Sequence, residues 1–260
     1  MKVAVAQIDC IPGDINANCQ KITDFAARAK TEQAELLVFP ELSDTGYVMA
    51  DIEQNASDFE SGLPFRTLRD CAVTHNMSII AGISERTTAG IYNVAVAINP
   101  QGLMIANYRK VHLYAPSGED VFESGHELVT FSLGDFTMGL MICYDIRFPE
   151  MARSLALKGA DVIVVPTAWP FPRVEHWQLL TRVRALENQC YLIGANRVGR
   201  DEAAYLCGNS RIVDPHGVTV SSSSEDQEEI IYGTLEKHKI KYVRERMPVF
   251  KHRRPEVYLG

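Results

Sequence analysis

Two halves of the chain repeat the same succession of apolar runs and turns, and this repetition limits the folds open to it. The matched pairs are residues 34–41 (AELLVFPE) with 160–167 (ADVIVVPT), 79–82 (IIAG) with 191–194 (YLIG), and 99–102 (NPQG) with 214–217 (DPHG). Short, nearly continuous apolar runs that end at Pro or Gly are typical of strands buried on both faces. The repetition therefore predicts two related half-units, each built around its own sheet.

Apolar periodicity along the whole chain predicts strands and helices in alternation. The predicted strands are residues 3–8, 35–39, 78–84, 93–99, 103–109, 128–133, 137–143, 161–165, 190–195, 209–213 and 218–222. The predicted helices are residues 16–30, 64–75, 151–157 and 175–188. Helices on one side of each sheet leave the other sheet face apolar, and that face has to be buried. Packing the two apolar faces together predicts an α/β fold, a four-layer α-β-β-α sandwich.

The pattern runs without a linker, so we expect a single domain over residues 1–260. The formal net charge of −7 argues against general nucleic-acid binding, which needs a basic surface to neutralise phosphates. Residues 237–254 are rich in Lys and Arg, but Glu and apolar residues are mixed with them, so we interpret them as a solvated surface.

The cysteine pattern and the hydropathy of the chain indicate in which cellular compartment the protein is expected. No apolar run approaches the roughly 20 residues of a membrane-spanning helix. The N-terminal residues 1–7 read as a strand and lack the apolar region and cleavage site of a signal peptide. None of the six cysteines forms a C-x-x-C pair, so we expect neither a disulfide framework nor a zinc site. We therefore expect a cytoplasmic protein with no nucleic-acid or membrane partner.

Three predicted strands end at side chains that can do chemistry. Cys143 follows the apolar run 138–142, and a predicted helix begins soon after it. Glu41 follows the apolar run 36–40, and Lys110 follows a third predicted strand. The strand fixes such a residue, the turn exposes it, and free backbone N–H groups at a helix start favour negative charge. A thiol, a carboxylate and an amine from distant parts of the chain thus predict one assembled catalytic site.

The segments around these residues resemble the three signature segments of the nitrilase superfamily of carbon–nitrogen hydrolases. They are residues 39–42 (FPEL), 108–113 (YRKVHL) and 142–150 (ICYDIRFPE). The resemblance extends over nearly the whole chain, from residues 3–7 (VAVAQ) to residues 247–250 (MPVF). Within the superfamily, the segments most similar to the omega-amidase branch are residues 169–170, 173, 176–177 and 184–189 (RALENQ).

The resemblance implies the α-β-β-α sandwich that the repetition predicts independently. It also implies hydrolysis of a non-peptide C–N bond through a cysteine acyl-enzyme, with no metal and no organic cofactor. It further implies self-association, as a homodimer or a higher homo-oligomer, through helices near the active-site turn. We expect a C-terminal extension, about residues 240–260, to run along the body or along the partner.

The resemblance and the chemistry give these residues definite roles. Cys143 is the candidate nucleophile, and its thiol, with an ordinary pKa of about 8.5, needs a base or a field that favours the thiolate. Glu41 is the candidate base, because burial would raise its pKa toward the range useful for proton transfer. Lys110 and the backbone N–H of Tyr144 are the candidate oxyanion donors. The alternative for Cys143 is a buried, inert thiol, which we expect for the other five cysteines.

Members of the superfamily often use a second glutamate between the lysine and the cysteine. The candidates here are Glu119, Asp120 and Glu123. Glu119 has the most plausible position, nine residues after Lys110, whereas Glu123 lies in a segment that reads as a structural turn. The alternative for each is an exposed loop carboxylate.

The segments beyond the strand ends supply candidates for substrate binding. Tyr47 and Trp169 lie just after predicted strands and could wall the site, although both could equally be ordinary packing residues. Arg173 could hold a substrate carboxylate through two hydrogen bonds, and His176 lies beside it near the start of a helix. Tyr144 completes this set next to the nucleophile.

The turn that follows Cys143 contains two opposite charges, Asp145 and Arg147. An ion pair between them could order this turn, so we interpret both residues as structural. Neither is counted among the candidate substrate-binding residues.

These assignments lead to one preferred function and two alternatives. The preferred function is hydrolysis of a small primary amide to acid and ammonia, and the branch resemblance suggests an omega-amide such as 2-oxoglutaramate or 2-oxosuccinamate. A nitrilase or an N-carbamoyl amidohydrolase would use the same residues. A non-catalytic binding or assembly protein on this fold is the alternative of another class, but such a protein would not need all three of Glu41, Lys110 and Cys143.

Overall fold

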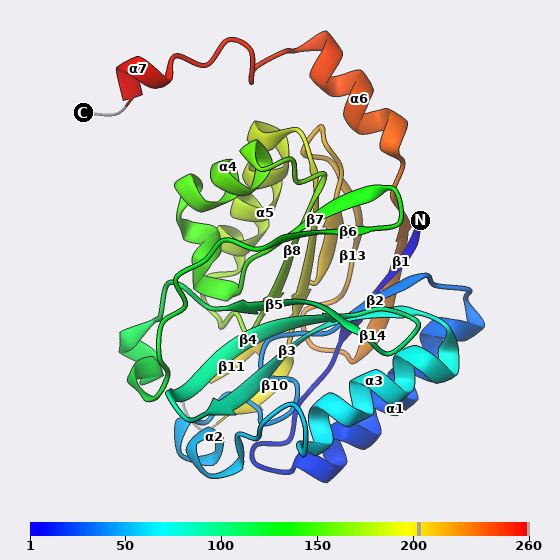
Figure 1. Ribbon diagram of the computed structural model, residues 1–260, viewed down its shortest axis with the longest axis vertical. Coiled ribbons are helices and arrows are strands. Elements are labelled where there is room, and N and C mark those ends of the chain that lie inside the picture. Colours follow the sequence, from blue (N-terminus) through cyan, green and yellow to red (C-terminus); the bar gives the residue numbers. More distant parts are fainter. Residues whose placement is uncertain (202–203, 259–260) are drawn as a thin grey trace.

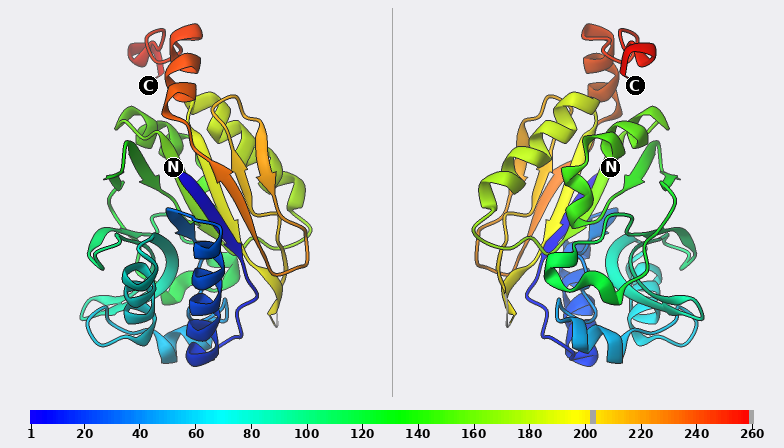
Figure 2. Two further views of the ribbon diagram at one scale, coloured as in Figure 1. Left: turned by 90° about the vertical axis from the view of Figure 1, so that its right-hand side faces the viewer. Right: turned by 90° about the vertical axis from the view of Figure 1, so that its left-hand side faces the viewer.

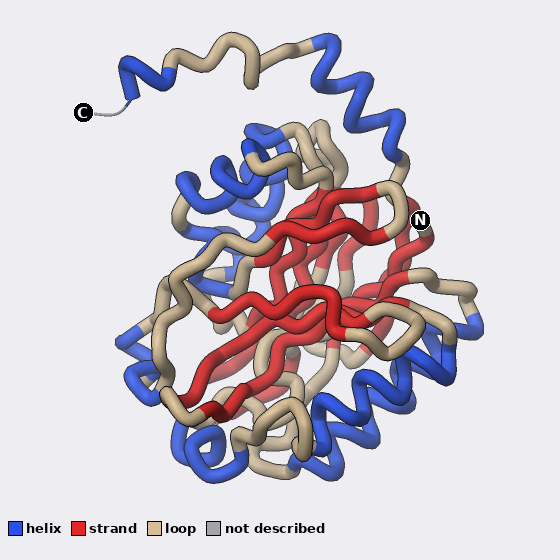
Figure 3. The backbone as a smooth tube through the Cα atoms, in the orientation of Figure 1, coloured by secondary structure: helices blue, strands red, loops and turns tan. Residues whose placement is uncertain are grey.

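The computed structural model describes residues 1–201 and 204–258, and its framework is two six-stranded sheets packed face to face (Figure 1). The first sheet has the strand order β14-β1-β2-β3-β4-β5, and the second has the order β13-β12-β9-β8-β7-β6. The strands lie in the middle of the molecule and the main helices lie outside them (Figure 3). The predicted four-layer sandwich is confirmed.

All eleven predicted strands are present, and a twelfth, β14, completes the two sheets. The first sheet contains β1 (Lys2–Gln7), β2 (Leu36–Val38), β3 (Ser78–Thr87), β4 (Gly90–Ile98), β5 (Met104–Arg109) and β14 (Glu229–Thr234). The second contains β6 (Thr130–Leu133), β7 (Phe136–Leu140), β8 (Val162–Thr167), β9 (Tyr191–Asn196), β12 (Arg211–Val213) and β13 (Thr219–Ser222). The prediction that the strand reaches Cys143 is wrong, because β7 ends at Leu140.

The four predicted helices cover the outer faces of the sheets. They are α1 (Ile15–Thr31), α3 (Leu63–His75), α4 (Pro149–Leu157) and α5 (Val174–Asn188). Helices α1 and α3 lie on the first sheet, and α4 and α5 lie on the second (Figure 1). The side chain of Asp14 caps α1 by accepting from the backbone N–H of Ala17, which satisfies one of the free donors at the helix start.

The two sheets share one topology, as the repeated sequence pattern predicts. Strands β1, β2 and β3 run parallel, and β4 and β5 follow antiparallel. Strands β7, β8 and β9 likewise run parallel, and β12 and β13 follow antiparallel. Each sheet gains one antiparallel strand, β14 beside β1 and β6 beside β7. The matched apolar runs therefore form the equivalent strands β2 and β8.

Alternation along β1 divides its side chains between two cores. Val3 and Val5 belong to the core between the two sheets, whereas Ala4 and Ala6 belong to the core beneath α1 and α3. Period-two alternation produces this division, since successive side chains point to opposite faces of a strand. Both faces of β1 are thus closed by apolar packing, and the rim of the sheets is where polar groups can meet.

Several elements were not predicted. They are α2 (Met49–Asn55), β10 (Val198–Asp201), β11 (Ala204–Cys207), β14, α6 (Lys237–Arg246) and α7 (Pro255–Tyr258). In α6 the high density of charge hides an amphipathic pattern, because Ile240 and Val243 are buried. The interpretation of residues 237–254 as wholly solvated is therefore wrong for this face of α6.

The C-terminal helices extend away from the sandwich at one end of the molecule (Figures 1 and 2). Helix α6 leaves the body beyond β14, and α7 lies further along the same arm. The last two residues of the predicted extension, 259–260, fall outside the described part of the chain. Among the described helices, none has the length and apolar character needed to cross a membrane.

Candidate active site

Three strand ends bring a carboxylate, an amine and a thiol to one rim of the sandwich. Glu41 lies three residues after β2, Lys110 directly follows β5, and Cys143 lies three residues after β7. Two antiparallel steps separate β3 from β5, so β5 and β2 end at the same edge. The Glu41 Oε2 atom accepts a hydrogen bond, at 2.9 Å, from the backbone N–H of Ala168, which follows β8. This bond joins the rims of the two sheets.

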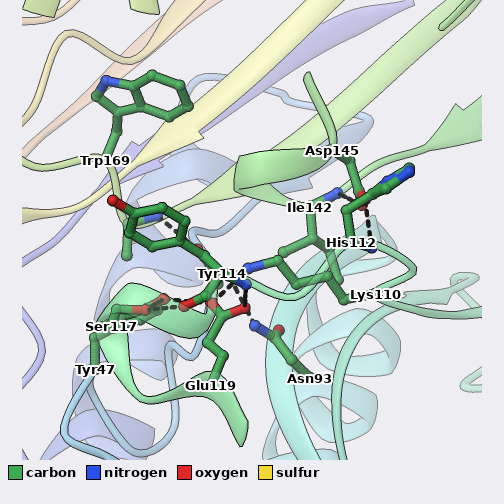
Figure 4. A network of polar contacts seen from close by, with 12 residues as sticks. Tyr47, Asn93, Lys110, His112, Tyr114, Ser117, Glu119, Ile142, Asp145 and Trp169 are labelled. Atoms are coloured by element: carbon green, nitrogen blue, oxygen red, sulfur yellow. Dashed lines mark hydrogen bonds and ion pairs between the residues drawn. The ribbon is translucent and has the colours of Figure 1, made fainter. Parts of the chain in front are cut away.

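Lys110 and Glu41 form an ion pair that is closed to solvent. The Lys110 Nζ atom donates to Glu119 Oε1 at 2.6 Å (Figure 4) and to Glu41 Oε1 at 2.8 Å. All three side chains are 0% exposed. Burial raises the pKa of Glu41, although Lys110 opposes that rise. Burial also acts to lower the pKa of Lys110, but the two carboxylates outweigh it and hold that pKa well above its usual value. The lysine is therefore a fixed positive charge.

Glu119 is the one of the three candidate second carboxylates that reaches Lys110. It begins the short 3₁₀ helix η2 (Glu119–Val121), where its Oε2 atom accepts from the backbone N–H of Tyr114 at 2.7 Å. The hydroxyl of Tyr47 donates to its Oε1 atom. Asp120 and Glu123 are exposed. The buried position of Glu119 agrees with the role expected for a second glutamate, and the positions of the other two do not.

Cys143 occupies a strained position at the start of the 3₁₀ helix η3 (Cys143–Arg147). Its φ angle is +45°, in the left-handed region that non-glycine residues rarely adopt and that often marks a functional site. Burial raises the pKa of its thiol, Glu41 raises it further, and Lys110 only partly offsets them. The thiol is therefore neutral at rest, and of the two activations expected from the sequence, a base rather than a thiolate-stabilising field fits the structure.

Gly82 on β3 lets the backbone of Glu41 pass at close range. A Cβ atom at Gly82 would lie 2.5 Å from the Glu41 Cα atom and 2.7 Å from the carbonyl oxygen of Pro40. Backbone atoms cannot swing aside as a side chain can, so Glu41 itself would have to move. The glycine is thus required for the placement of the candidate base.

We expect Gly82→Ala to lower kcat about 100-fold, because a displacement of about 1 Å in a catalytic group can have this effect. Gly233→Ala is the matched control, since its Cβ would meet only the end of the Ile212 side chain, at 2.8 Å. Steady-state kinetics and thermal unfolding of both variants provide the measurement. Equal kcat values for the two variants would contradict this expectation.

Asp145 holds the turn of Cys143 against the segment that carries Lys110. Its Oδ2 atom accepts from the Tyr108 hydroxyl at 2.6 Å and from the backbone N–H of Ile142 at 2.9 Å. Its Oδ1 atom accepts from the backbone N–H of His112 at 3.1 Å and lies 2.8 Å from the Nδ1 atom of that ring (Figure 4). The predicted ion pair between Asp145 and Arg147 is wrong, because the carboxylate is already occupied by these groups.

Cys143 opens on a cavity of about 670 Å³. Four of the five predicted substrate-binding residues line this cavity, namely Tyr47, Tyr144, Trp169 and Arg173. The fifth, His176, is exposed outside it and lies 3.5 Å from the guanidinium of Arg147. His176, near the start of α5, is therefore not a lining residue of this cavity, although it contacts one, Arg147.

The cavity also has walls that sequence reasoning missed. Arg147 lines it and stacks over the ring of Trp169, 4.6 Å from its centroid. Tyr205 comes from the unpredicted hairpin β10–β11, and its ring packs edge-on against Phe171 at the mouth. For Arg147, the only sequence signal of a place in the cavity was its position four residues after Cys143. For Tyr205 there was none, because β10 and β11 lack the alternating apolar pattern that identifies strands.

The remaining cysteines show no arrangement comparable to that of Cys143. Cys10, Cys19, Cys71, Cys190 and Cys207 are all buried free thiols. Within residues 1–201 and 204–258, no group of three or more His, Cys, Asp or Glu side chains is placed to hold a metal ion. Of the six cysteines, Cys143 is the one that the cavity lining includes.

Comparison with known proteins places the chain in a well-defined group. A sequence model described as carbon-nitrogen hydrolase matches residues 2–245. The chain is 33% identical over 259 residues to the 2-oxoglutaramate amidase of Bacillus subtilis, with 98% of each chain covered. The alignment therefore covers nearly the whole length of both proteins.

Solved structures share the fold of this chain. Saccharomyces cerevisiae Nit3, described as a member of branch 10 of the nitrilase superfamily, superimposes with a TM-score of 0.91 at 31% identity, covering 98% of this chain and 96% of that one. A glutamate-to-glutamine variant of the amidase from Nesterenkonia sp. AN1 carries acrylamide added at its active-site cysteine. It superimposes with a TM-score of 0.86 at 28% identity, covering 96% of this chain and 99% of that one.

Proposed function

The chain belongs to the carbon–nitrogen hydrolase family, and we propose that it hydrolyses a small primary amide through a thioester on Cys143. The observation that carries the proposal is that Cys143, which lines the cavity, lies within the electrostatic reach of the buried ion pair between Glu41 and Lys110. The neutral thiol needs a base, Glu41 has the raised pKa of a proton acceptor, and Lys110 stays positive. Each chemical need of amide hydrolysis has a matching group.

In the first half-reaction, Glu41 takes the proton of the Cys143 thiol as the sulfur attacks the amide carbon. The C–S bond forms, and the carbonyl oxygen becomes an oxyanion beside Lys110 and the backbone N–H of Tyr144. The C–N bond then breaks, and the proton on Glu41 passes to the leaving nitrogen, so ammonia departs. Lys110 acts without reorganisation, because Glu41 and Glu119 already hold its amine in place.

In the second half-reaction, Glu41 takes a proton from water as the water oxygen attacks the thioester carbon. The C–S bond breaks, the carboxylic acid leaves, and the proton returns to the Cys143 sulfur. The same carboxylate thus serves in turn as base and as acid. No proton has to enter or leave the site from outside during the cycle.

Charge in the cavity supports a substrate that carries a carboxylate. The guanidinium groups of Arg147 and Arg173 both line the cavity, and neither forms an ion pair within 4.0 Å with a described carboxylate. Asp201, the acidic lining residue, is already engaged by two hydrogen bonds from Arg197, at 2.9 and 3.1 Å. An omega-amide of a 2-oxo dicarboxylic acid, such as 2-oxoglutaramate or 2-oxosuccinamate, has both the amide and the anion that this arrangement fits.

We expect Arg173→Leu to raise KM for such an omega-amide by about 10- to 100-fold, the factor for a lost hydrogen bond to a charged group. The kcat/KM for a neutral primary amide should change far less. Arg200→Leu is the matched control, because Arg200 is an exposed arginine of β10 that does not line the cavity. An equal loss of kcat/KM for the charged and the neutral amide would show that Arg173 does not bind the substrate carboxylate.

Ammonia release from a panel of amides, nitriles and N-carbamoyl amino acids tests the reaction class. Turnover of a nitrile or of an N-carbamoyl compound, with none of any omega-amide, would replace the preferred substrate by an alternative. A protein that turns over none of them and forms no adduct at Cys143 would be a binding or assembly protein. Intact-mass measurement with each compound detects a thioester directly.

We further propose one domain over residues 1–260, a cytoplasmic location and a homodimer. The C-terminal arm supports the dimer, since residues 237–256 contain eight Lys or Arg against two Glu in a chain of net charge −7. Helix α6 packs one face against its own body, through Ile240 and Val243, and the chain beyond it projects from the end of the sandwich, where its positive charge is suited to the acidic body of a second copy. Light scattering of the full chain and of a chain ending at residue 236 measures whether the arm sets the stoichiometry.

A further inference from the structure

Asn93 joins two of the candidate catalytic segments to each other. Its side-chain Nδ2 atom donates to Glu41 Oε1 at 2.7 Å, and its backbone carbonyl accepts from the backbone N–H of Lys110 at 2.9 Å. One residue of β4 therefore fixes the carboxylate of Glu41 and the main chain of Lys110 at the same time. The sequence offers no sign of this, because Asn93 lies inside an apolar strand, 52 residues from Glu41.

Packing alone does not explain an asparagine at this position. Asn93 is 0% exposed and lies on the same face of β4 as Ala95 and Ala97, which belong to the core between the two sheets. Its Oδ1 atom is buried and has no hydrogen-bond partner among the described residues. An apolar side chain would avoid the cost of that unpaired oxygen. The amide is thus retained despite a cost to the core, and its one side-chain partner is Glu41.

We infer that Asn93 is a positioning residue for the general base, which it holds toward Cys143 in its ionised form by donating one hydrogen bond to the Oε1 atom of Glu41. This inference rests on the proposed function of Glu41. The same Oε1 atom also accepts from Lys110, and Oε2 accepts from the backbone N–H of Ala168, so each contact comes from a different element. Loss of the Asn93 bond would leave the carboxylate free to turn about the remaining two.

The bond also has a defined electrostatic effect. A donor to the ionised carboxylate lowers its pKa, and in Glu41 this acts against the rise that burial causes. The other charged or titratable groups near Glu41 are Lys110 after β5, Glu119 in η2, Cys143 in η3 and Tyr47, whose hydroxyl donates to Glu119. None of these is altered by a change at Asn93. Removal of the bond should therefore raise the pKa of Glu41 and require a higher pH for base catalysis.

The test compares Asn93→Leu with Asn107→Leu in the full-length protein. Asn107 is a partly buried asparagine on the adjacent strand β5 whose Oδ1 atom also lacks a partner among the described residues, but it has no hydrogen bond to Glu41. The first readout is the pH dependence of kcat and KM. The second is the pH dependence of Cys143 alkylation by iodoacetamide, followed by mass spectrometry, which requires no knowledge of the substrate.

For Asn93→Leu we expect kcat to fall about 10- to 100-fold, the factor for a lost hydrogen bond to a charged group, with KM little changed. We also expect the acidic limb of both pH profiles to move to higher pH by about one unit, a shift that Asn107→Leu should not cause. Asn93→Asp, which replaces the donor with an acceptor, should move the limb in the same direction, and it provides the test if the leucine variant does not fold.

Two results would overturn the inference. One is an alkylation profile of folded Asn93→Leu, or of Asn93→Asp, that coincides with that of the parent. The other is a loss of kcat that accompanies loss of thermal stability without movement of the acidic limb, since that would be a purely structural effect. Failure of the parent to hydrolyse any amide would instead count against the proposed function, because the alkylation profile is measured without substrate.

Discussion

Replacement of Cys143 by alanine is expected to lower kcat for amide hydrolysis by about 10⁴-fold or more, because loss of a nucleophile removes the covalent route altogether. The protein should remain folded. The side chain fills little volume at the rim of the cavity, and alanine meets the same backbone restriction at a φ of +45° as cysteine does. Ammonia release and the thermal unfolding midpoint together measure this outcome.

Cys190→Ala supplies the control, since Cys190 is a fully buried thiol that does not line the cavity. It should lose stability through the small space that it leaves, while its kcat stays near that of the parent. Intact-mass measurement of the parent with substrate should show an adduct that Cys143→Ala does not form. If the alanine variant kept kcat within about ten-fold of the parent, a cysteine acyl-enzyme would be ruled out.

The parts of this site that sequence reasoning placed correctly are those carried by strand ends. Glu41 and Cys143 each follow an apolar run, and such runs report strands with little ambiguity when both faces are buried. Lys110 follows the more polar strand β5, which the turn before it helped to locate. The repeated succession of runs and turns also predicted the matched topology of the two sheets. Local patterns were sufficient to predict that these residues meet, because the direction in which each strand runs determines which strand ends lie at the same edge of a sheet.

The parts that sequence reasoning missed depend on contacts between distant residues. Asp145 was paired with its neighbour Arg147, whereas it binds Tyr108 and His112, more than thirty residues away. Asn93 had no local signal, since its partner Glu41 lies 52 residues away, beyond the end of β2. Proximity in sequence is a weak guide to side-chain partners in a turn, because a turn points successive side chains in different directions.

Replacement of Lys110 by methionine is expected to lower the free energy of unfolding by about 3–5 kcal/mol at pH 8, in addition to removing an oxyanion donor. Methionine is close to lysine in volume, so the loss is chiefly one of charge. Glu41 and Glu119, both 0% exposed, would then face each other with no cation between them. A buried carboxylate without a partner is among the most costly arrangements that a core can contain.

The pH dependence separates this cause from a packing defect. Without Lys110 the pKa of Glu41, already raised by burial, should rise further above its unfolded value. A group whose folded-state pKa is raised binds its proton more tightly in the folded state, so the variant should lose stability as pH rises from the unfolded to the folded pKa. The difference in unfolding free energy between parent and Lys110→Met should therefore be smaller at pH 5 than at pH 8.

Urea unfolding at both pH values measures the difference, and Arg109→Met is the control. The Arg109 side chain is 37% exposed and pairs with Glu85 at 2.7 Å, so its loss should change the unfolding free energy by about 1 kcal/mol or less. A loss for Lys110→Met that is equal at the two pH values would assign it to packing. A loss no greater than that of Arg109→Met would show that the buried carboxylates do not need the lysine, and with it the account of Lys110 as the fixed charge of the site would fail.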